Sequence, residues 1–200
     1  MENNTIKEKI CNALLSTKRV GVDRLIEKME EIGFFEAPCS TNHHLCKVGG
    51  LAEHSLNVFE HGRMMAKSLY PDMAEYKEML PSITLVTLLH DLGKTGYNGQ
   101  PMYIENVLKN GKVSATKPFK TNTSLLPFPH EVLSWVIANE FIKLTDEEAW
   151  AILCHNGLYG PLRQIVMSHE TPLYLILHDA DMWASRVTEG KGDDCDEDDE

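Results

Sequence analysis

The chain has 200 residues, of which 42% are hydrophobic and 24% charged, and its formal net charge is −11. This composition indicates one domain with a hydrophobic core. The acidic balance argues against a protein that holds duplex nucleic acid by charge, so no stable binding to duplex DNA is expected. No stretch approaches the roughly 20 apolar residues that cross a bilayer, and the N-terminus lacks the features of a secretory signal. We therefore expect a cytoplasmic protein with no membrane partner.

The five cysteines are scattered and form no CxxC pair, which argues against a cysteine-rich zinc site. In a reducing compartment an odd number of cysteines indicates free thiols. The nine histidines are more informative, because several lie inside apolar segments, where an imidazole without a partner is costly. These histidines are therefore expected to have polar partners or ligands.

The first 40 residues are expected to pack on the core as two short amphipathic helices. These cover about residues 4–16 and 21–33, with a break near Gly21 and an end at Gly33. A polar loop follows, and a longer helix is predicted from Leu51 to about residue 69.

The next segment is predicted as two helices divided by a proline. One covers about residues 72–80, and Pro81 suits the first turn of the next, which is apolar along most of its length and should be buried. Residues 100–122 have a different pattern, with β-branched and aromatic residues around Asn110-Gly111, a good hairpin turn. The sequence therefore predicts a β-hairpin inserted between helices.

Helices resume near Pro129. Thr145 and Glu148 form a capping-box pattern, and Thr171-Pro172 is predicted to begin the last helix. The end of the chain, residues 189–200, is expected to be a disordered acidic tail that aids solubility or, alternatively, binds a partner or metal weakly. The fold class that follows is all-α, a helical bundle with one small inserted β-hairpin.

The strongest chemical signal is the pair His90-Asp91 in LLHDLGK. A carboxylate at the end of a buried apolar helix is expensive without a partner, and a divalent cation satisfies it. Imidazole and carboxylate are good ligands for iron, manganese or zinc. The dipeptide alone is weak support, because such pairs also occur by chance and in helix caps.

Two further motifs strengthen this interpretation. GGLAEHS places His54 early in a helix, and ADMWASR places Asp181 on the last one. With LLHDLGK, this order resembles the HD superfamily of metal-dependent phosphohydrolases. The resemblance covers roughly residues 43–188, so we expect an HD domain over 41–188 with the hairpin as an insertion. It implies that His54, His90, Asp91 and Asp181 hold at least one metal ion. The nearby residues His178 and Asp179 are alternatives to Asp181 as the last ligand.

Two more histidines fit a variant of the pattern. His130 lies in PFPHEVLSWVI and His155 in AILCHNGLYG. Members of the superfamily with binuclear sites have two additional histidines in this interval, which implies one or two ions with Asp91 as the bridge. We expect a divalent metal, and its identity stays open among Mn, Fe, Zn, Ni, Co and Mg. Structural roles at helix ends are the alternative for both histidines. HD exoribonucleases have a related HHG motif, from which this chain departs at Asn156.

A basic stretch directly follows the His-Asp pair, with five lysines and one acid between Lys94 and Lys120. Lys94 is expected to neutralise charge on a phosphate, or else to complement the helix dipole. The hairpin is either a lid over an anionic substrate or a plain solvated hairpin. The residues expected to contact substrate are His44, Lys117, Lys120 and Arg186.

These features predict a hydrolase that cleaves a phosphate mono- or diester of a small nucleotide-like substrate or short oligonucleotide. A metal ion supplies hydroxide near neutral pH, and Asp91 and Lys94 are the expected catalytic residues. An HD-type di-iron oxygenase is the alternative with the same ligand set. An exonuclease-like HD enzyme and a degenerate binding module also remain open.

Overall fold

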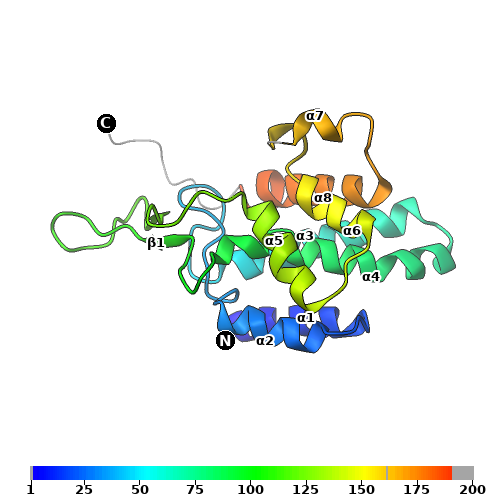
Figure 1. Ribbon diagram of the computed structural model, residues 1–200, viewed down its shortest axis with the longest axis horizontal. Coiled ribbons are helices and arrows are strands. Elements are labelled where there is room, and N and C mark those ends of the chain that lie inside the picture. The colour runs from blue at the N-terminus through cyan, green and yellow to red at the C-terminus, as the bar shows by residue number, and fades with distance from the viewer. Residues whose placement is uncertain (1, 161, 191–200) are drawn as a thin grey trace.

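The structure is a computed structural model that describes residues 2–160 and 162–190, with side chains from residue 5 onward (Figure 1). Helices account for most of this region, which confirms the all-α class. The α-helices are α1 (Glu2–Ser16), α2 (Val22–Glu31), α3 (Gly50–Leu69), α4 (Met73–Leu89), α5 (His130–Phe141), α6 (Asp146–Cys154), α7 (Arg163–Val166) and α8 (Pro172–Trp183). Shorter turns are η1 (Leu92–Thr95), η2 (Gly157–Tyr159) and the π-helical η3 (Ala184–Thr188), and the strands are β1 (Tyr103–Glu105) and β2 (Phe119–Thr121).

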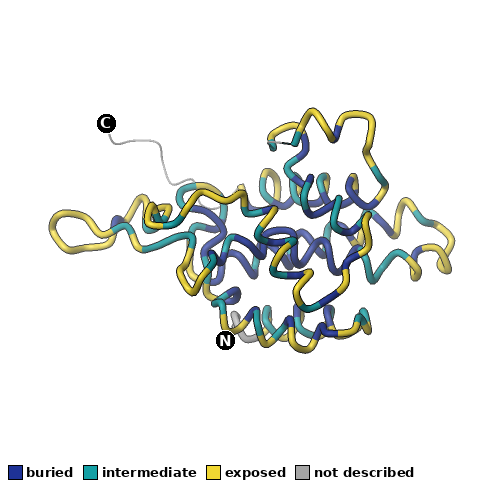
Figure 2. Tube along the Cα trace, in the orientation of Figure 1, coloured by how far each residue is buried: buried dark blue, intermediate teal, exposed yellow. Residues whose placement is uncertain are grey.

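Helix α3 lies at the centre and packs against α1, α4 and α8. Gly62 makes this approach possible. A Cβ atom at that position would lie 2.9 Å from Thr87 Cγ2 on α4 and 3.7 Å from the Cβ of Ala180 on α8. The buried side chains of these helices form one hydrophobic core (Figure 2). The three helices that carry most of the predicted ligands are thus held together by the core itself.

Helix α4 runs without interruption from Met73 to Leu89, with Pro81 inside it. The prediction of two helices divided at Pro81 is therefore wrong. An internal proline costs about 3 kcal/mol, because it removes a hydrogen bond and crowds the preceding turn. The run from Ile83 to Leu89 is buried throughout, and this tertiary burial outweighs the local cost.

The N-terminal helices lie along one side of the bundle (Figure 1). They bury Ile10, Leu14, Leu25 and Met29 against the core. Arg19, in the turn between α1 and α2, donates hydrogen bonds of 2.9 and 2.5 Å to the Glu148 carboxylate on α6. Glu148 is fully buried, and its ion pair with Arg19 links the N-terminal helices to α6.

The inserted hairpin is confirmed. Strands β1 and β2 pair antiparallel, with Tyr103 opposite Thr121, and a bridge between Val107 and Val113 extends the pairing toward Asn110-Gly111. Gly111 supplies the left-handed backbone conformation that the turn needs, with φ of 78°. The hairpin, called the arm below (residues 97–128), projects from the helices and is largely exposed (Figures 1 and 2).

Both predicted helix caps are present. Thr145 and Glu148 form a reciprocal capping box on α6, and the Thr171 hydroxyl accepts a hydrogen bond from the Tyr174 N–H. The predicted acidic tail lies outside the described residues except for residues 189 and 190. Glu189 does not behave as part of a tail, because it is only 8% exposed. No helix in the described ranges has the length and apolar character needed to cross a membrane.

Candidate metal centre

Six side chains predicted as metal ligands meet at one end of the bundle. They come from five places in the fold: α3, the end of α4, which supplies two of them, the start of α5, the end of α6, and α8. Overlapping groups of three have ligand atoms within 4.8 Å of one another. The six residues are His54, His90, Asp91, His130, His155 and Asp181.

One half of the cluster surrounds His54 and His90. Their Nε2 atoms are 3.3 Å apart. Asp181 Oδ1 lies 3.2 Å from the Nε2 of His54, and Asp91 Oδ2 lies 3.5 Å from it. These separations are close to the roughly 3 Å between neighbouring ligands of one ion with bond lengths near 2.1 Å. Asp179 is exposed, so Asp181 is the α8 carboxylate that reaches the cluster.

The other half uses the second oxygen of the Asp91 carboxylate. Asp91 Oδ1 lies 3.1 Å from His130 Nε2 and 3.6 Å from His155 Nε2. This oxygen is buried and has no hydrogen-bond partner among the described residues. A buried carboxylate oxygen without a donor is costly, and a cation held with the two imidazoles satisfies it. Asp91 therefore faces both halves.

Hydrogen bonds outside the cluster fix the orientation of three imidazoles. The Nδ1–H of His90 donates to the Thr87 carbonyl at 2.9 Å, and that of His155 donates to the Ile152 carbonyl at 2.8 Å. His54 donates from Nδ1 to the Glu189 carboxylate at 3.0 Å. Because each Nδ1 carries the proton, each Nε2 presents a lone pair to the cluster. This arrangement is typical of metal-ligating histidines.

Glu189 is a functional residue that sequence reasoning missed. Besides His54, it accepts a hydrogen bond of 2.9 Å from the Asn57 side chain. These bonds outweigh the effect of burial and hold the pKa of the Glu189 carboxyl below its usual value. In the sequence Glu189 precedes an acidic run and has no local pattern that separates it from the other acids.

His130 depends on close contact between α5 and η1. The Gly93 N–H donates to the Ser134 hydroxyl at 2.8 Å, which in turn donates to the His130 carbonyl at 2.8 Å. A Cβ atom at Gly93 would lie 2.7 Å from the Cβ of Leu133 and 2.8 Å from the backbone nitrogen of Ser134. Only glycine therefore lets α5 begin close enough to place His130 beside Asp91.

Asn156 takes a structural role beside the cluster. Its side-chain amide donates to Glu131, whose other carboxylate oxygen lies 3.6 Å from His130 Nδ1. Glu131 is buried and was also missed at the sequence level. His178 donates from Nδ1 to the His155 carbonyl at 2.7 Å and so supports the turn that carries His155.

The electrostatics of the cluster favour ionised carboxylates. Burial raises the pKa of Asp91, but the adjacent Lys94 and His90 outweigh it and hold this pKa well below its ordinary value. Burial likewise opposes ionisation of Asp181, yet the hydrogen bond with His54 and the nearby imidazoles lower its pKa. Burial, with the neighbouring His90, lowers the pKa of His155 to about 3. Neutral His155 and ionised aspartates are the forms that bind a metal.

Lys94 lies at the inner wall of the site. Its Nζ atom is 2.6 Å from Asp91 Oδ2 and 3.8 Å from the sulfur of Cys39. Burial disfavours its charge, but Asp91 and other nearby groups raise its pKa well above the ordinary value. Burial raises the pKa of Tyr103 on β1, and the charge of Lys94 partly opposes this, so the base of the arm lies within electrostatic reach of Lys94. Whether Lys94 acts on a phosphate or complements the helix dipole stays a prediction.

The other predicted substrate contacts lie around this centre with different degrees of exposure. The His44 side chain is 19% exposed and its ring centroid is 4.9 Å from that of His54. Lys117 and Lys120 are exposed on the arm. The Arg186 guanidinium lies over the ring of Tyr159 at 5.8 Å. Contact of these four side chains with a substrate stays a prediction.

The fold and the donor set together define a helical domain in which four imidazoles and two carboxylates form clusters that could hold a divalent metal. A sequence family described as the HD domain matches residues 51–182, so the chain belongs to the HD-domain family. Members of this family bind divalent metals and are generally metal-dependent hydrolases. No curated protein and no solved structure matches the chain.

Proposed function

We propose that this protein is a metal-dependent phosphohydrolase that cleaves a phosphate mono- or diester of a small, nucleotide-like substrate. The observation that carries the proposal is the Asp91 carboxylate, which turns one oxygen toward His54 and His90 and the other toward His130 and His155. A carboxylate shared between two halves of a donor set is typical of two-metal phosphoester hydrolysis.

The side chains have separate tasks in this reaction. His54, His90, Asp91 and Asp181 would hold one cation, and Asp91, His130 and His155 would hold a second. When bound, such cations lower the pKa of water and polarise a phosphoryl oxygen. Asp91 is the carboxylate placed to orient the attacking water. Lys94 is already within 2.6 Å of Asp91, so its ammonium adds positive charge where phosphate charge develops.

An anionic substrate is supported by the distribution of charge. The chain as a whole is acidic, yet the arm carries four lysines and begins beside Lys94. Lys109 and Lys112 lie near the tip, whereas Lys117 lies just before β2 and Lys120 lies on it. Lys117, Lys120, Arg186 and His44 are the side chains proposed to attract and position the substrate.

The test combines metal analysis with a substrate panel. The purified protein is assayed with Mn²⁺, Fe²⁺, Zn²⁺, Ni²⁺, Co²⁺ and Mg²⁺ against nucleoside monophosphates, cyclic nucleotides, short oligonucleotides and an aromatic phosphodiester. We expect release of phosphate or a nucleotide with at least one metal. Asp91→Asn should lower kcat by about 1000-fold or more, because it removes the charge shared by both halves.

The Lys117→Gln/Lys120→Gln variant should raise KM several-fold and leave kcat nearly unchanged, because these charges act on binding. Lys67→Gln, on the opposite end of α3, is the matched control and should behave as wild type. Oxygen consumption with iron and no hydrolysis of any ester would overturn the proposal in favour of an oxygenase. Absence of bound metal at every condition would also overturn it.

A further inference from the structure

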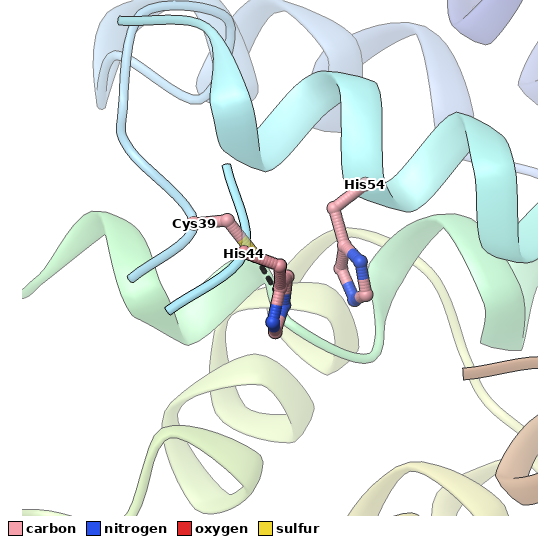
Figure 3. A group of neighbouring side chains, drawn as sticks. All are labelled: Cys39, His44 and His54. Carbon is pink, nitrogen blue, oxygen red and sulfur yellow. Dashed lines mark hydrogen bonds between the residues drawn. The ribbon is translucent and has the colours of Figure 1, made fainter. Parts of the chain in front are cut away.

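A second group of metal-binding side chains lies directly beside the six-ligand centre, on the loop that precedes α3. Cys39 Sγ is 3.4 Å from His44 Nε2. Cys39, His44 and His54 each offer a ligand atom, and these atoms lie within 4.8 Å of one another (Figure 3). Cys39 is fully buried, and the His44 side chain is 19% exposed. The group is therefore enclosed, with access past His44.

The spacing and chemistry of this group suit a thiophilic cation. Zinc bonds of about 2.0 Å to nitrogen and 2.3 Å to sulfur place neighbouring tetrahedral ligands about 3.5 Å apart. The separation of Cys39 Sγ and His44 Nε2 is 3.4 Å. Thiolate and imidazole favour zinc and other soft or borderline ions, whereas Mg²⁺ prefers oxygen ligands. The sulfur thus distinguishes this group from the six-ligand centre, which contains none.

His54 belongs to both groups but has one nitrogen to offer. Its Nδ1–H is held by both oxygens of Glu189, at 3.0 and 3.1 Å. The Nε2 atom is the one that faces His90 and Asp181. Because an imidazole nitrogen has a single lone pair, Nε2 binds one ion at a time. An ion drawn toward Cys39 and His44 therefore competes with the six-ligand centre for His54.

We propose that Cys39, His44 and His54 form a site for a thiophilic divalent cation such as Zn²⁺, and that its occupation inhibits the enzyme by withdrawing His54 from the six-ligand centre. On binding, the Cys39 thiol loses its proton to solvent and a sulfur lone pair forms the bond to the metal, with no change of oxidation state. Burial raises the pKa of the Cys39 thiol, and His54 and Lys94, whose Nζ is 3.8 Å from the sulfur, only partly oppose this, so the metal ion itself must displace the thiol proton. The inhibition rests on the proposed function, whereas the binding site does not.

Cobalt(II) is the probe for binding, because a cobalt–thiolate bond gives a near-ultraviolet charge-transfer absorption that histidine and carboxylate ligands do not give. We expect this absorption when Co²⁺ is titrated into the wild-type protein and into Cys11→Ser, a matched control on α1. Cys39→Ser should lack the absorption yet still bind cobalt at the six-ligand centre. His44→Gln, which keeps the thiol, should need about tenfold more Co²⁺ to reach the same absorption.

Circular dichroism and the unfolding midpoint establish that each variant is folded. If Cys39→Ser does not fold, the comparison of His44→Gln with the wild type decides the question. A cobalt-saturated wild-type protein without the charge-transfer band would overturn the site. The same band in Cys39→Ser would also overturn it.

Inhibition is measured separately, as the Zn²⁺ concentration that halves each variant's own Mn²⁺-supported activity. We expect this concentration to be about tenfold higher for Cys39→Ser than for wild type or Cys11→Ser. Equal zinc sensitivity would overturn the inhibitory role while the cobalt band still reports on the site. If no phosphate ester is hydrolysed, the proposed function is wrong, and the cobalt titration still tests whether Cys39 and His44 bind a metal.

Discussion

Single residues that are not metal ligands themselves determine the orientation of the ligand side chains. His54 is the clearest case, because its ring is held from behind by Glu189, 135 positions away in the chain. The carboxylate both orients the ring and keeps the proton on Nδ1. Burial opposes a positive charge on His54, but Cys39 and the hydrogen bonds to Asp181 and Glu189 outweigh that effect and raise its pKa. A metal ion that binds His54 must therefore displace the proton on Nε2, while Glu189 keeps the proton on Nδ1.

Replacement of Glu189 should therefore weaken metal binding without removing any ligand. We expect Glu189→Gln to lower the affinity for Mn²⁺ about tenfold and Glu189→Ala about 100-fold, because Gln still accepts the Nδ1–H bond but lacks charge. Isothermal titration calorimetry measures both. Glu60→Gln is the control, because this half-exposed side chain on α3 pairs with Arg63 on the same helix. Unchanged affinity in Glu189→Ala would contradict the positioning role.

At the scale of elements, the site depends on how closely helices meet. Helix α5 begins against η1, with Ser134 bridging the Gly93 N–H and the His130 carbonyl. This contact brings His130 beside Asp91, although 38 residues, including the whole arm, lie between them in the chain. The second half of the centre therefore depends on the absence of a side chain at Gly93 as well as on the Ser134 hydroxyl.

Gly93→Ala should force α5 away from η1. We expect a loss of about 1–3 kcal/mol in the free energy of unfolding, as for an overpacked contact. Metal titration should show weaker binding to the half formed by Asp91, His130 and His155. Gly111→Ala, at the tip of the arm with no atom within 4 Å of the added Cβ, is the control. It introduces backbone strain but should leave metal binding unchanged. A Gly93→Ala protein with wild-type stability and metal affinity would contradict this account.

At the scale of the whole molecule, a buried ion pair joins the two sides of the bundle. Glu148 accepts hydrogen bonds from Arg19, from the Thr145 N–H and from the Ser82 hydroxyl. Burial alone raises the pKa of this carboxyl, but these partners outweigh it and hold the pKa below the ordinary value of 4.5. A lowered carboxyl pKa contributes stability above pH 4.5 that is lost as pH falls through the folded-state pKa.

Glu148→Gln should lower the free energy of unfolding at pH 7 by about 3 kcal/mol, because Arg19 loses its charged partner. The difference from wild type should shrink as pH falls below 4.5, where the wild-type carboxyl becomes protonated. Urea unfolding of the metal-free proteins between pH 3 and 7 measures this. Glu140→Gln on the exposed face of α5 should change stability by less than about 0.5 kcal/mol. A pH-independent difference would show that ionisation of Glu148 is not its cause.

Local patterns in the sequence were enough to predict several parts of the protein. The capping box of Thr145 and Glu148, the hairpin at Asn110-Gly111 and the His90-Asp91 motif each depend on residues close together in the chain, whose geometry is fixed by backbone stereochemistry. Motif order also predicted the six residues that the structure brings together. Local patterns therefore predicted the helical class, whereas the donor set of the centre came from the resemblance to the HD superfamily.

Tertiary structure alone decided the remaining features. The continuous α4 contradicts the local preference at Pro81, because burial of the following turns is worth more than one lost hydrogen bond. Glu189 behind His54, Glu131 beside His130 and Cys39 beside His44 have no short-range signal, since each position is set by the packing of helices and loops. The sequence specified which side chains can bind a metal, and packing specified which way their nitrogens, oxygens and sulfur face.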